Sequence, residues 1–162
     1  MKPNEKELPP FAINQIGLVV KDREKAMEKF SSIWGIGPFR LRDTSIKLLN
    51  ADDPKLPYDG KTKDLKGKLA FAKRGPIELE FIEPVGQDNI WAEFLNRNGE
   101  CVHHVAMDVS DLDKELERLK EKGIRILQYG ENEYVKLAFL DTEETLGVIV
   151  ELLQRKLSLI HI

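Results

Sequence analysis

The chain contains the same pattern twice, and this repeat limits what it can fold into more than any other feature. The stretch "QIGLVVKDREKAMEKFSSIWGI" begins at Gln15, and "HVAMDVSDLDKELERLKEKGI" begins at His104. Both read as a short strand, an Asp, a charged amphipathic helix and a Gly-Ile pair. Gln15 precedes His104 by 89 residues, and Asp22 precedes Asp111 by the same number. Agreement across a strand and a helix indicates a duplicated module.

Three further strands follow the helix in each half of the repeat. In the first half they are "GIGPFRLR", "KLAFA" and "GPIELEFIEP", and in the second "IRILQYG", "YVKLAFLD" and "GVIVELLQ". Alternating polar and apolar positions with many β-branched residues are typical of strands. The sequence therefore predicts an α+β fold of two strand–helix–strand–strand–strand modules, residues 11–86 and 100–154, within one domain spanning 11–154.

Two segments lie outside the repeated pattern. The stretch "DNIWAEFLNRNG" predicts a linking helix within 87–99, which begins at an Asp88 or Asn89 cap and ends at Gly99. The segment 44–67 is long and polar, which favours a loop. That loop is either a lid over a site or a disordered stretch.

The module helices have apolar stripes that predict buried faces. Apolar residues recur three or four positions apart, and Asp22 and Asp111 stand where an N-cap belongs. Gly123 predicts the end of the second helix. The stripe residues, all expected in the core, are Met27, Phe30, Trp34, Leu112, Leu116 and Leu119.

The composition narrows the classes of function. The net charge is −3 and no basic block is present, so nucleic acid is not an expected partner. No apolar run approaches the roughly 20 residues that span a bilayer, and the charged start of the chain lacks the apolar core of a secretory signal. The lone Cys101 excludes an intrachain disulfide and fits a reducing compartment. These features predict a cytoplasmic protein without a membrane partner.

The C-terminal tail, "KLSLIHI", predicts an interface. Exposed apolar patches often mark the contact between two chains. We therefore expect a homodimer; the alternative is a tail folded over its own sheet. The apolar residues of the tail are Leu157, Leu159, Ile160 and Ile162.

The first strand of each module has one face that is typical of a cavity wall. Side chains alternate across a strand, so Gln15 shares a face with Gly17, and His104 shares one with Ala106. A polar group followed by a small residue leaves room beside the strand. By the same alternation, His103 is predicted to point to the helix-packed side, at its rim.

The last strand of each module has a carboxylate among apolar neighbours: Glu78 or Glu80 in the first and Glu151 in the second. An ionised carboxylate there is costly unless a cation or hydrogen-bond donors meet it; the simpler explanation is an edge strand or a Glu that reaches solvent. If the first and last strands line one concave sheet, the carboxylates converge with Gln15 and His104. That set predicts a divalent metal site, since His suits Zn, Ni or Co and oxygen ligands suit Mn, Co or Mg.

The chain resembles the vicinal oxygen chelate superfamily over roughly residues 11–154. The motifs that carry the resemblance are "NQIGLVVKD", "GIGPF", "IELEFIEPVG", "HHVAMDVSD" and "GVIVELLQ". Members include glyoxalase I, methylmalonyl-CoA epimerase, extradiol dioxygenases and bleomycin-resistance proteins. The resemblance implies the glyoxalase-like fold, in which paired βαβββ modules form a cupped mixed sheet with the helices outside.

The resemblance also implies the residues of the site. It selects Glu80 over Glu78 and implies one divalent ion, Zn, Co, Ni or Mn. The epimerase and glyoxalase branches share abstraction of a proton α to a carbonyl, which makes Glu151 the expected base and Glu80 its symmetric partner. The implied ligands are Gln15, Glu80, His104 and Glu151.

The substrate motifs of both branches are incomplete here. The stretch "EPVGQDNIWAEFLNRNGECVHHVAMDV" is similar in sequence to methylmalonyl-CoA epimerases, which act on an acyl-CoA thioester. Those epimerases have a Glu-Gln-Gly pattern, and this chain has "KDLKG", which includes Asp64, in its place. Val19 and Pro84 stand where glyoxalases place an Arg and an Asn to bind glutathione.

The resemblance favours an epimerase. The alternatives are a lactoylglutathione lyase acting on a glutathione hemithioacetal and a non-catalytic binder of the bleomycin-resistance type. An extradiol oxygenase is disfavoured because its iron site uses two His and one Glu.

Overall fold

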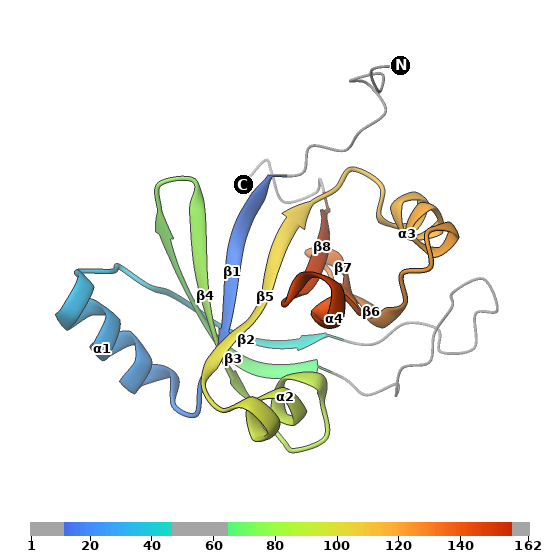
Figure 1. Ribbon diagram of the computed structural model, residues 1–162. Helices are drawn as coiled ribbons and strands as arrows, with labels where there is room; N and C mark the ends of the chain where they lie inside the picture. The colour runs from blue at the N-terminus through green and yellow to red at the C-terminus, as the bar shows by residue number, and fades with distance from the viewer. Residues whose placement is uncertain (1–11, 47–64, 157–162) are drawn as a thin grey trace.

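The computed structural model describes residues 12–46 and 65–156, whose strands form one eight-stranded sheet (Figure 1). The strand order is β2-β3-β4-β1-β5-β8-β7-β6. In chain order the elements are β1 (Ile13–Val19), α1 (Arg23–Trp34), β2 (Arg40–Ile46), β3 (Leu65–Arg74), β4 (Ile77–Pro84), α2 (Ile90–Asn98), β5 (Cys101–Asp108), α3 (Leu112–Glu121), β6 (Ile126–Glu131), β7 (Val135–Leu140), α4 (Glu143–Leu146) and β8 (Ile149–Arg155).

The sheet has two halves with the same internal arrangement. Strand β1 runs parallel to β4, and β5 runs parallel to β8. The antiparallel pair β1–β5 joins the halves at the centre. Figure 1 shows the sheet curled, with α1 and α3 at opposite outer sides and α2 below the central strands. The predicted fold class, paired βαβββ modules forming a cupped mixed sheet, is confirmed. The module bounds 11–86, 87–99 and 100–154 stay a prediction.

The helices begin where their capping residues predict. Asp22 and Asp111 each accept a hydrogen bond from the backbone N–H three residues on, and Asn89 does the same for α2. Each such cap contributes on the order of 1 kcal/mol. Leu112 and Leu116 of α3 are buried against the second module, as expected.

The prediction that Trp34 belongs to the core is wrong, since its side chain is 67% exposed. Phe30 does pack under α1, with its ring centroid 4.8 Å from that of Phe81. The buried cluster beneath α1 contains only Val20, Ala70 and Phe81 among the described residues. Ile33, in the same last turn of α1, is exposed as well.

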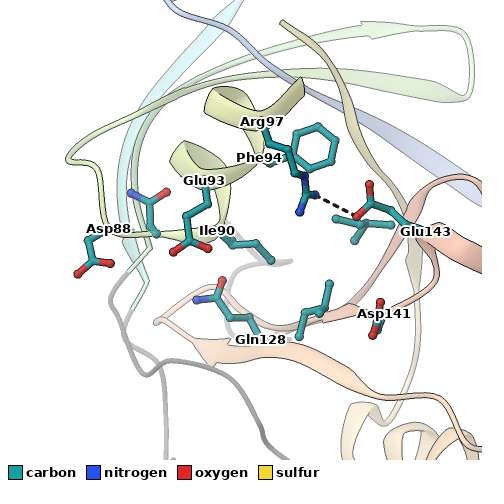
Figure 2. Close-up of a pocket in the computed structure, with 11 residues that line it drawn as sticks. Asp88, Ile90, Glu93, Phe94, Arg97, Gln128, Asp141 and Glu143 are labelled. Carbon is teal, nitrogen blue, oxygen red and sulfur yellow. Dashed lines mark hydrogen bonds and ion pairs between the residues drawn. The ribbon is translucent and has the colours of Figure 1, made fainter. Parts of the chain in front are cut away.

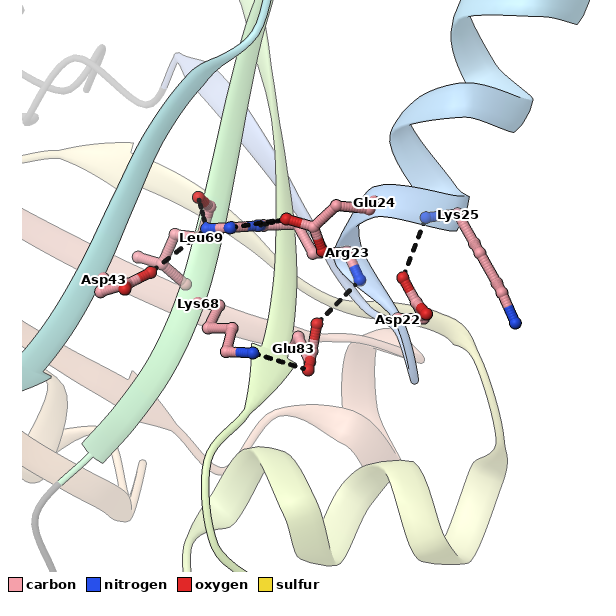
Figure 3. Close-up of polar contacts among 8 residues, drawn as sticks. All are labelled: Asp22, Arg23, Glu24, Lys25, Asp43, Lys68, Leu69 and Glu83. Carbon is pink, nitrogen blue, oxygen red and sulfur yellow. Dashed lines mark hydrogen bonds and ion pairs between the residues drawn. The ribbon is translucent and has the colours of Figure 1, made fainter.

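The N-terminus of α1 is tied to three strands of the first module by Arg23 (Figure 3). Its guanidinium donates to the Leu69 carbonyl and to Asp43, each at 3.2 Å. Its backbone N–H donates to Glu83 at 2.9 Å. These bonds satisfy a nearly buried cation and set the angle at which α1 leaves the sheet.

The predicted loop 44–67 is shorter than expected at both ends. Thr44 pairs with Gly67, and Ile46 pairs with Leu65, because the antiparallel β2–β3 ladder continues there. A side chain at Gly67 would collide with the Trp91 ring, whose nearest carbon lies 2.9 Å from the position of a Cβ. Residues 47–64, with the proposed lid and Asp64, lie outside the described residues.

The apolar residues fill two layers. One cluster occupies the inside of the cup and the adjoining face of α2, and another lies between α3 and the sheet. Fully burying a Val, Leu, Ile or Phe side chain contributes about 1.5–3 kcal/mol to stability. In residues 12–46 and 65–156, no helix is both long and apolar enough to cross a membrane. The tail residues expected at a dimer interface, 157–162, also lie outside the described part.

Candidate metal centre

The structure brings the four predicted site side chains together on the concave face of the sheet. His104 Nε2 lies 3.0 Å from Glu151 Oε2, 3.3 Å from Glu80 Oε2 and 3.5 Å from Gln15 Oε1. All four residues are buried, with exposures between 1% and 7%. They come from the four central strands, β1, β4, β5 and β8.

The strand registers of the two modules explain this convergence. Gln15 and Gly17 of β1 pair with Glu78 and Glu80 of β4. The equivalent pairs in the second module are His104 with Ile149, and Ala106 with Glu151. Because the register is the same in both halves, the two carboxylates lie symmetrically about the β1–β5 seam.

A small residue of each module pairs with a candidate ligand of the other module. Across the seam, Gly17 pairs with His104, and Ala106 pairs with Gln15. A Cβ on Gly17 would lie 2.1 Å from Cε1 of His104, so the imidazole rests directly on the Gly17 backbone. Gln15 lines the cavity described below, whereas the space beside Gly17 is filled by the His104 ring.

A cavity of about 480 Å³ opens over this cluster. A volume of this size suits a small-molecule substrate. Leu69, Phe71, Leu137 and Leu153 form part of its apolar wall. The side chains with positive charge that line it are Arg40, Arg42, Arg155 and Lys156.

Glu78 lies beside the cluster and orients Gln15. Its Oε1 accepts a hydrogen bond from Gln15 Nε2 at 3.0 Å, and its other oxygen lies 3.7 Å from Arg40. A carboxylate can only accept, so the amide NH₂ must face Glu78. The Gln15 carbonyl oxygen is thereby directed at His104. The sequence left Glu78 and Glu80 as alternatives; the structure gives them different surroundings.

The predicted direction of His103 is wrong. Gly17 pairs with His104 but Leu18 pairs with Val102, so the register skips His103 as a β-bulge does. A bulge breaks the alternation on which the prediction rested. The His103 ring, 0% exposed, packs edge-on between Phe94 and Phe139 and contacts His104. The skipped residue of β1, Asn14, occupies the equivalent position.

The two neighbouring histidines have opposite electrostatics. Burial alone would lower the pKa of His104, but Glu151 and Glu80 outweigh it and raise that pKa to about 10. Burial lowers the pKa of His103 well below its usual value, and the nearby His104 and Arg97 lower it further. Burial also raises the pKa of Glu80, although His104 opposes this. The protein without a bound cation therefore places a proton on His104 between two carboxyl groups.

The donor set fits a divalent metal ion. One ligand atom each from Glu80, His104 and Glu151 lies within 4.8 Å of the others, and Gln15 adds an amide oxygen nearby. Two carboxylates in a buried site have a negative charge that a divalent cation neutralises. Nitrogen and oxygen donors in this mixture suit Zn, Co, Ni or Mn.

The acidic group Asp22, Glu24 and Glu83 has a structural explanation instead. Asp22 caps α1, while Glu24 and Glu83 bind Arg23 (Figure 3). These carboxylates already have protein partners, so the group needs no metal.

A second pocket of about 320 Å³ lies between α2 and the second module (Figure 2). Arg97 of α2 reaches across it to Glu143, with 3.2 Å between Nη2 and Oε2. None of the four candidate ligands lines this pocket. Sequence periodicity offered no signal for it, because its walls come from elements distant in the chain.

The fold agrees with the class of protein found by comparison of sequences. The chain belongs to the Glyoxalase/Bleomycin resistance protein/Dioxygenase superfamily, whose family model matches residues 14–139. This confirms the resemblance to the vicinal oxygen chelate superfamily.

Individual relatives include methylmalonyl-CoA epimerases. The chain is 29% identical to the uncharacterized protein YqjC of Bacillus subtilis over 126 residues, which cover 75% of this chain and 89% of YqjC. It is 28% identical to the mitochondrial methylmalonyl-CoA epimerase of Bos taurus over 151 residues, covering 88% and 73%. A variant of Streptomyces coelicolor methylmalonyl-CoA epimerase, solved with 2-nitronate-propionyl-CoA, has the same fold, with a TM-score of 0.61, 22% identity and coverage of 88% and 95%.

Proposed function

We propose that this protein is a metal-dependent epimerase that removes and returns a proton α to the carbonyl of an acyl-CoA thioester. The observation that carries the proposal is the pair of buried carboxyl groups, Glu80 and Glu151, which line the cavity and lie 3.3 and 3.0 Å from His104 Nε2. The relatives named as methylmalonyl-CoA epimerases support the choice of reaction.

The proposed ligands of one divalent ion are Gln15, Glu80, His104 and Glu151. When bound, a Zn, Co, Ni or Mn ion would polarise the substrate carbonyl and stabilise the negative charge that develops on its oxygen. Buried surroundings strengthen that interaction, because water is excluded from the site. The protein itself contributes the orientation of the ligands and the groups that move the proton.

The two carboxyl groups would act on opposite faces of the α-carbon. Glu151 accepts the proton as the C–H bond breaks, and the electron pair delocalises onto the thioester carbonyl. Glu80, whose pKa is raised by burial, is suited to return a proton to the other face. Their symmetric placement allows the same steps in reverse, as an epimerase requires.

The lining of the cavity favours an acyl-CoA over a glutathione adduct. The guanidinium groups of Arg40, Arg42 and Arg155 provide positive charge for the phosphates of a CoA ester. Val19 is 0% exposed, and neither Val19 nor Pro84 lines the cavity, so neither position can bind glutathione there.

Exchange of hydrogen with solvent tests this proposal. The protein, loaded in turn with each of the four ions, is incubated in deuterated water with methylmalonyl-CoA or with the glutathione hemithioacetal of methylglyoxal. Solvent deuterium at the α-carbon of the recovered thioester is the expected result. Product formation from the hemithioacetal alone would favour the lyase. Metal binding without exchange on either compound would favour a non-catalytic binder and overturn the epimerase.

A further inference from the structure

Two adjacent buried imidazoles, His103 and His104, face each other through the same ring nitrogen. Their Nδ1 atoms are 2.9 Å apart, and the residues are 0% and 1% exposed. A contact at this distance between two ring nitrogens is a hydrogen bond only if one of them is protonated and the other is not. The position of that single proton decides whether the other ring nitrogen of His104, Nε2, can bind a cation.

The far side of His104 is the nitrogen that faces the two carboxyl groups. A neutral imidazole has one proton, so Nε2 can bind a cation only when the proton is on Nδ1. His103 must then accept at its own Nδ1 and keep its proton on Nε2. If His103 donated instead, the proton of a neutral His104 would occupy Nε2 and block it.

The surroundings of His103 point to this role rather than to packing alone. Its Nε2 is buried and has no hydrogen-bond partner among the described residues. A phenylalanine or leucine would fill the space between Phe94 and Phe139 without leaving a buried polar atom unpaired. The ring contacts, with centroids 4.8 and 5.3 Å away, hold the imidazole with Nδ1 toward His104.

We propose that His103 is a positioning residue that accepts a hydrogen bond from His104 Nδ1 and so keeps His104 Nε2 available for a metal ion. The inference rests on the proposed metal site and deepens it. It gives a role to the register shift in β5, which brings both imidazoles to one side of the strand. Outer partners of this kind fix the tautomer and ring orientation of metal-binding histidines.

Two substitutions at position 103 distinguish the effect of the hydrogen-bond acceptor from the effect of filling the space. His103→Asn places an amide oxygen near the position of Nδ1, so it preserves an acceptor. His103→Phe fills the space and removes the acceptor. Metal affinity is measured by competition with a chromophoric chelator, using zinc and cobalt, and near-ultraviolet circular dichroism verifies the fold of each variant.

We expect His103→Phe to lose roughly 10–100-fold in metal affinity. His103→Asn should retain most of the affinity. Equal affinity in folded His103→Phe and wild type would overturn the role of His103, and so would equal losses in both variants. Failure of the wild-type protein to bind any of the four ions would overturn the proposed function as well.

Nitrogen-15 NMR of the histidine rings gives a readout that needs no variant. In the zinc-loaded protein, His104 should show a proton on Nδ1 and none on Nε2, and His103 should show the reverse. A proton on His103 Nδ1 in the loaded protein would contradict the proposal even if His103→Phe failed to fold. Purely structural packing of His103 predicts no fixed relation between the two tautomers.

Discussion

Gln15 and His104 occupy equivalent positions in the two modules, but different neighbours orient them. In the first module Glu78, from the adjacent strand β4, receives the Gln15 amide. The equivalent residue in the second module is Ile149, which offers no polar group. His104 instead meets His103 from its own strand. The two modules thus share a strand register and differ in the side chains that hold the first ligand.

This difference assigns unequal tasks to the two halves of the site. An imidazole is a stronger ligand for Zn, Co or Ni than a neutral amide, so the second module should supply most of the metal affinity. The carboxyl groups Glu80 and Glu151 remain closely matched in position. We expect the chemistry to be shared between the modules and the binding of metal to be asymmetric.

The largest expected effect concerns the matched carboxyl groups. Glu151→Gln keeps an oxygen ligand but removes the base, so turnover should fall about 10²–10⁴-fold while most metal is retained. Glu80→Gln is the matched variant. Steady-state kinetics on both epimers of the thioester, with metal content from plasma mass spectrometry, measures the outcome. Wild-type turnover in Glu151→Gln would refute its role as base.

The next largest effect compares the two modules by removing the ligand in the first strand of each, His104 or Gln15. His104→Ala should weaken metal binding more than the roughly 100-fold expected at most for an outer partner. Gln15→Ala should cost about tenfold, because an amide oxygen contributes less than imidazole. Chelator competition measures both. Equal losses would mean that the two halves bind metal alike.

The packing at the seam should be asymmetric as well. Gly17→Ala places a methyl group 2.1 Å from the His104 ring, which must move. The expected cost is about 1–3 kcal/mol in the free energy of unfolding, with loss of metal affinity. Ala106→Gly is the matched control and should cost only about 0.5–1 kcal/mol. Urea unfolding of both variants tests this, and an unperturbed Gly17→Ala protein would contradict the observed contact.

The metal-free protein should lose stability as pH rises. The folded pKa of His104 is raised to about 10, above its unfolded value of about 6.5. Its stabilisation is therefore complete below about pH 6.5 and is lost as pH rises through the folded pKa, by roughly 2 kcal/mol between about pH 6.5 and 8.5. Urea unfolding with a chelator present measures the slope, and His104→Gln should lack this contribution. A flat profile in the wild type would contradict the charged His104.

The smallest expected effect concerns the outer partner of Gln15. Glu78→Gln can donate as well as accept, so it no longer dictates which atom of the Gln15 amide faces the site. Metal affinity should fall tenfold or less, below the effect of His103→Phe. Chelator competition with both variants compares the two outer partners directly. A greater loss at Glu78 would reverse the proposed asymmetry.

The constant offset between the two sequence repeats was sufficient to predict much of the fold. The offset shared by Gln15 and His104 predicted equivalent strands, and Asp22 and Asp111 predicted the helix starts, because caps and periodicity are local properties. Strand alternation suggested that Gln15 and His104 face a cavity, and the resemblance to the superfamily completed the predicted set with Glu80 and Glu151. That these residues bind metal and that the protein is a homodimer remain predictions.

Features that depend on neighbouring elements required the tertiary structure. The direction of His103 follows from a skipped residue in the β1–β5 pairing, which no period within β5 reveals. The apolar stripe of α1 does not by itself show which of its residues the sheet buries, and Trp34 is exposed. The resemblance selected Glu80 over Glu78 as a ligand, but the hydrogen bond from Gln15 to Glu78 is visible only in the tertiary structure. The sequence determined which residues each strand presents because alternation is local, whereas the pairing of distant strands decided which of them meet.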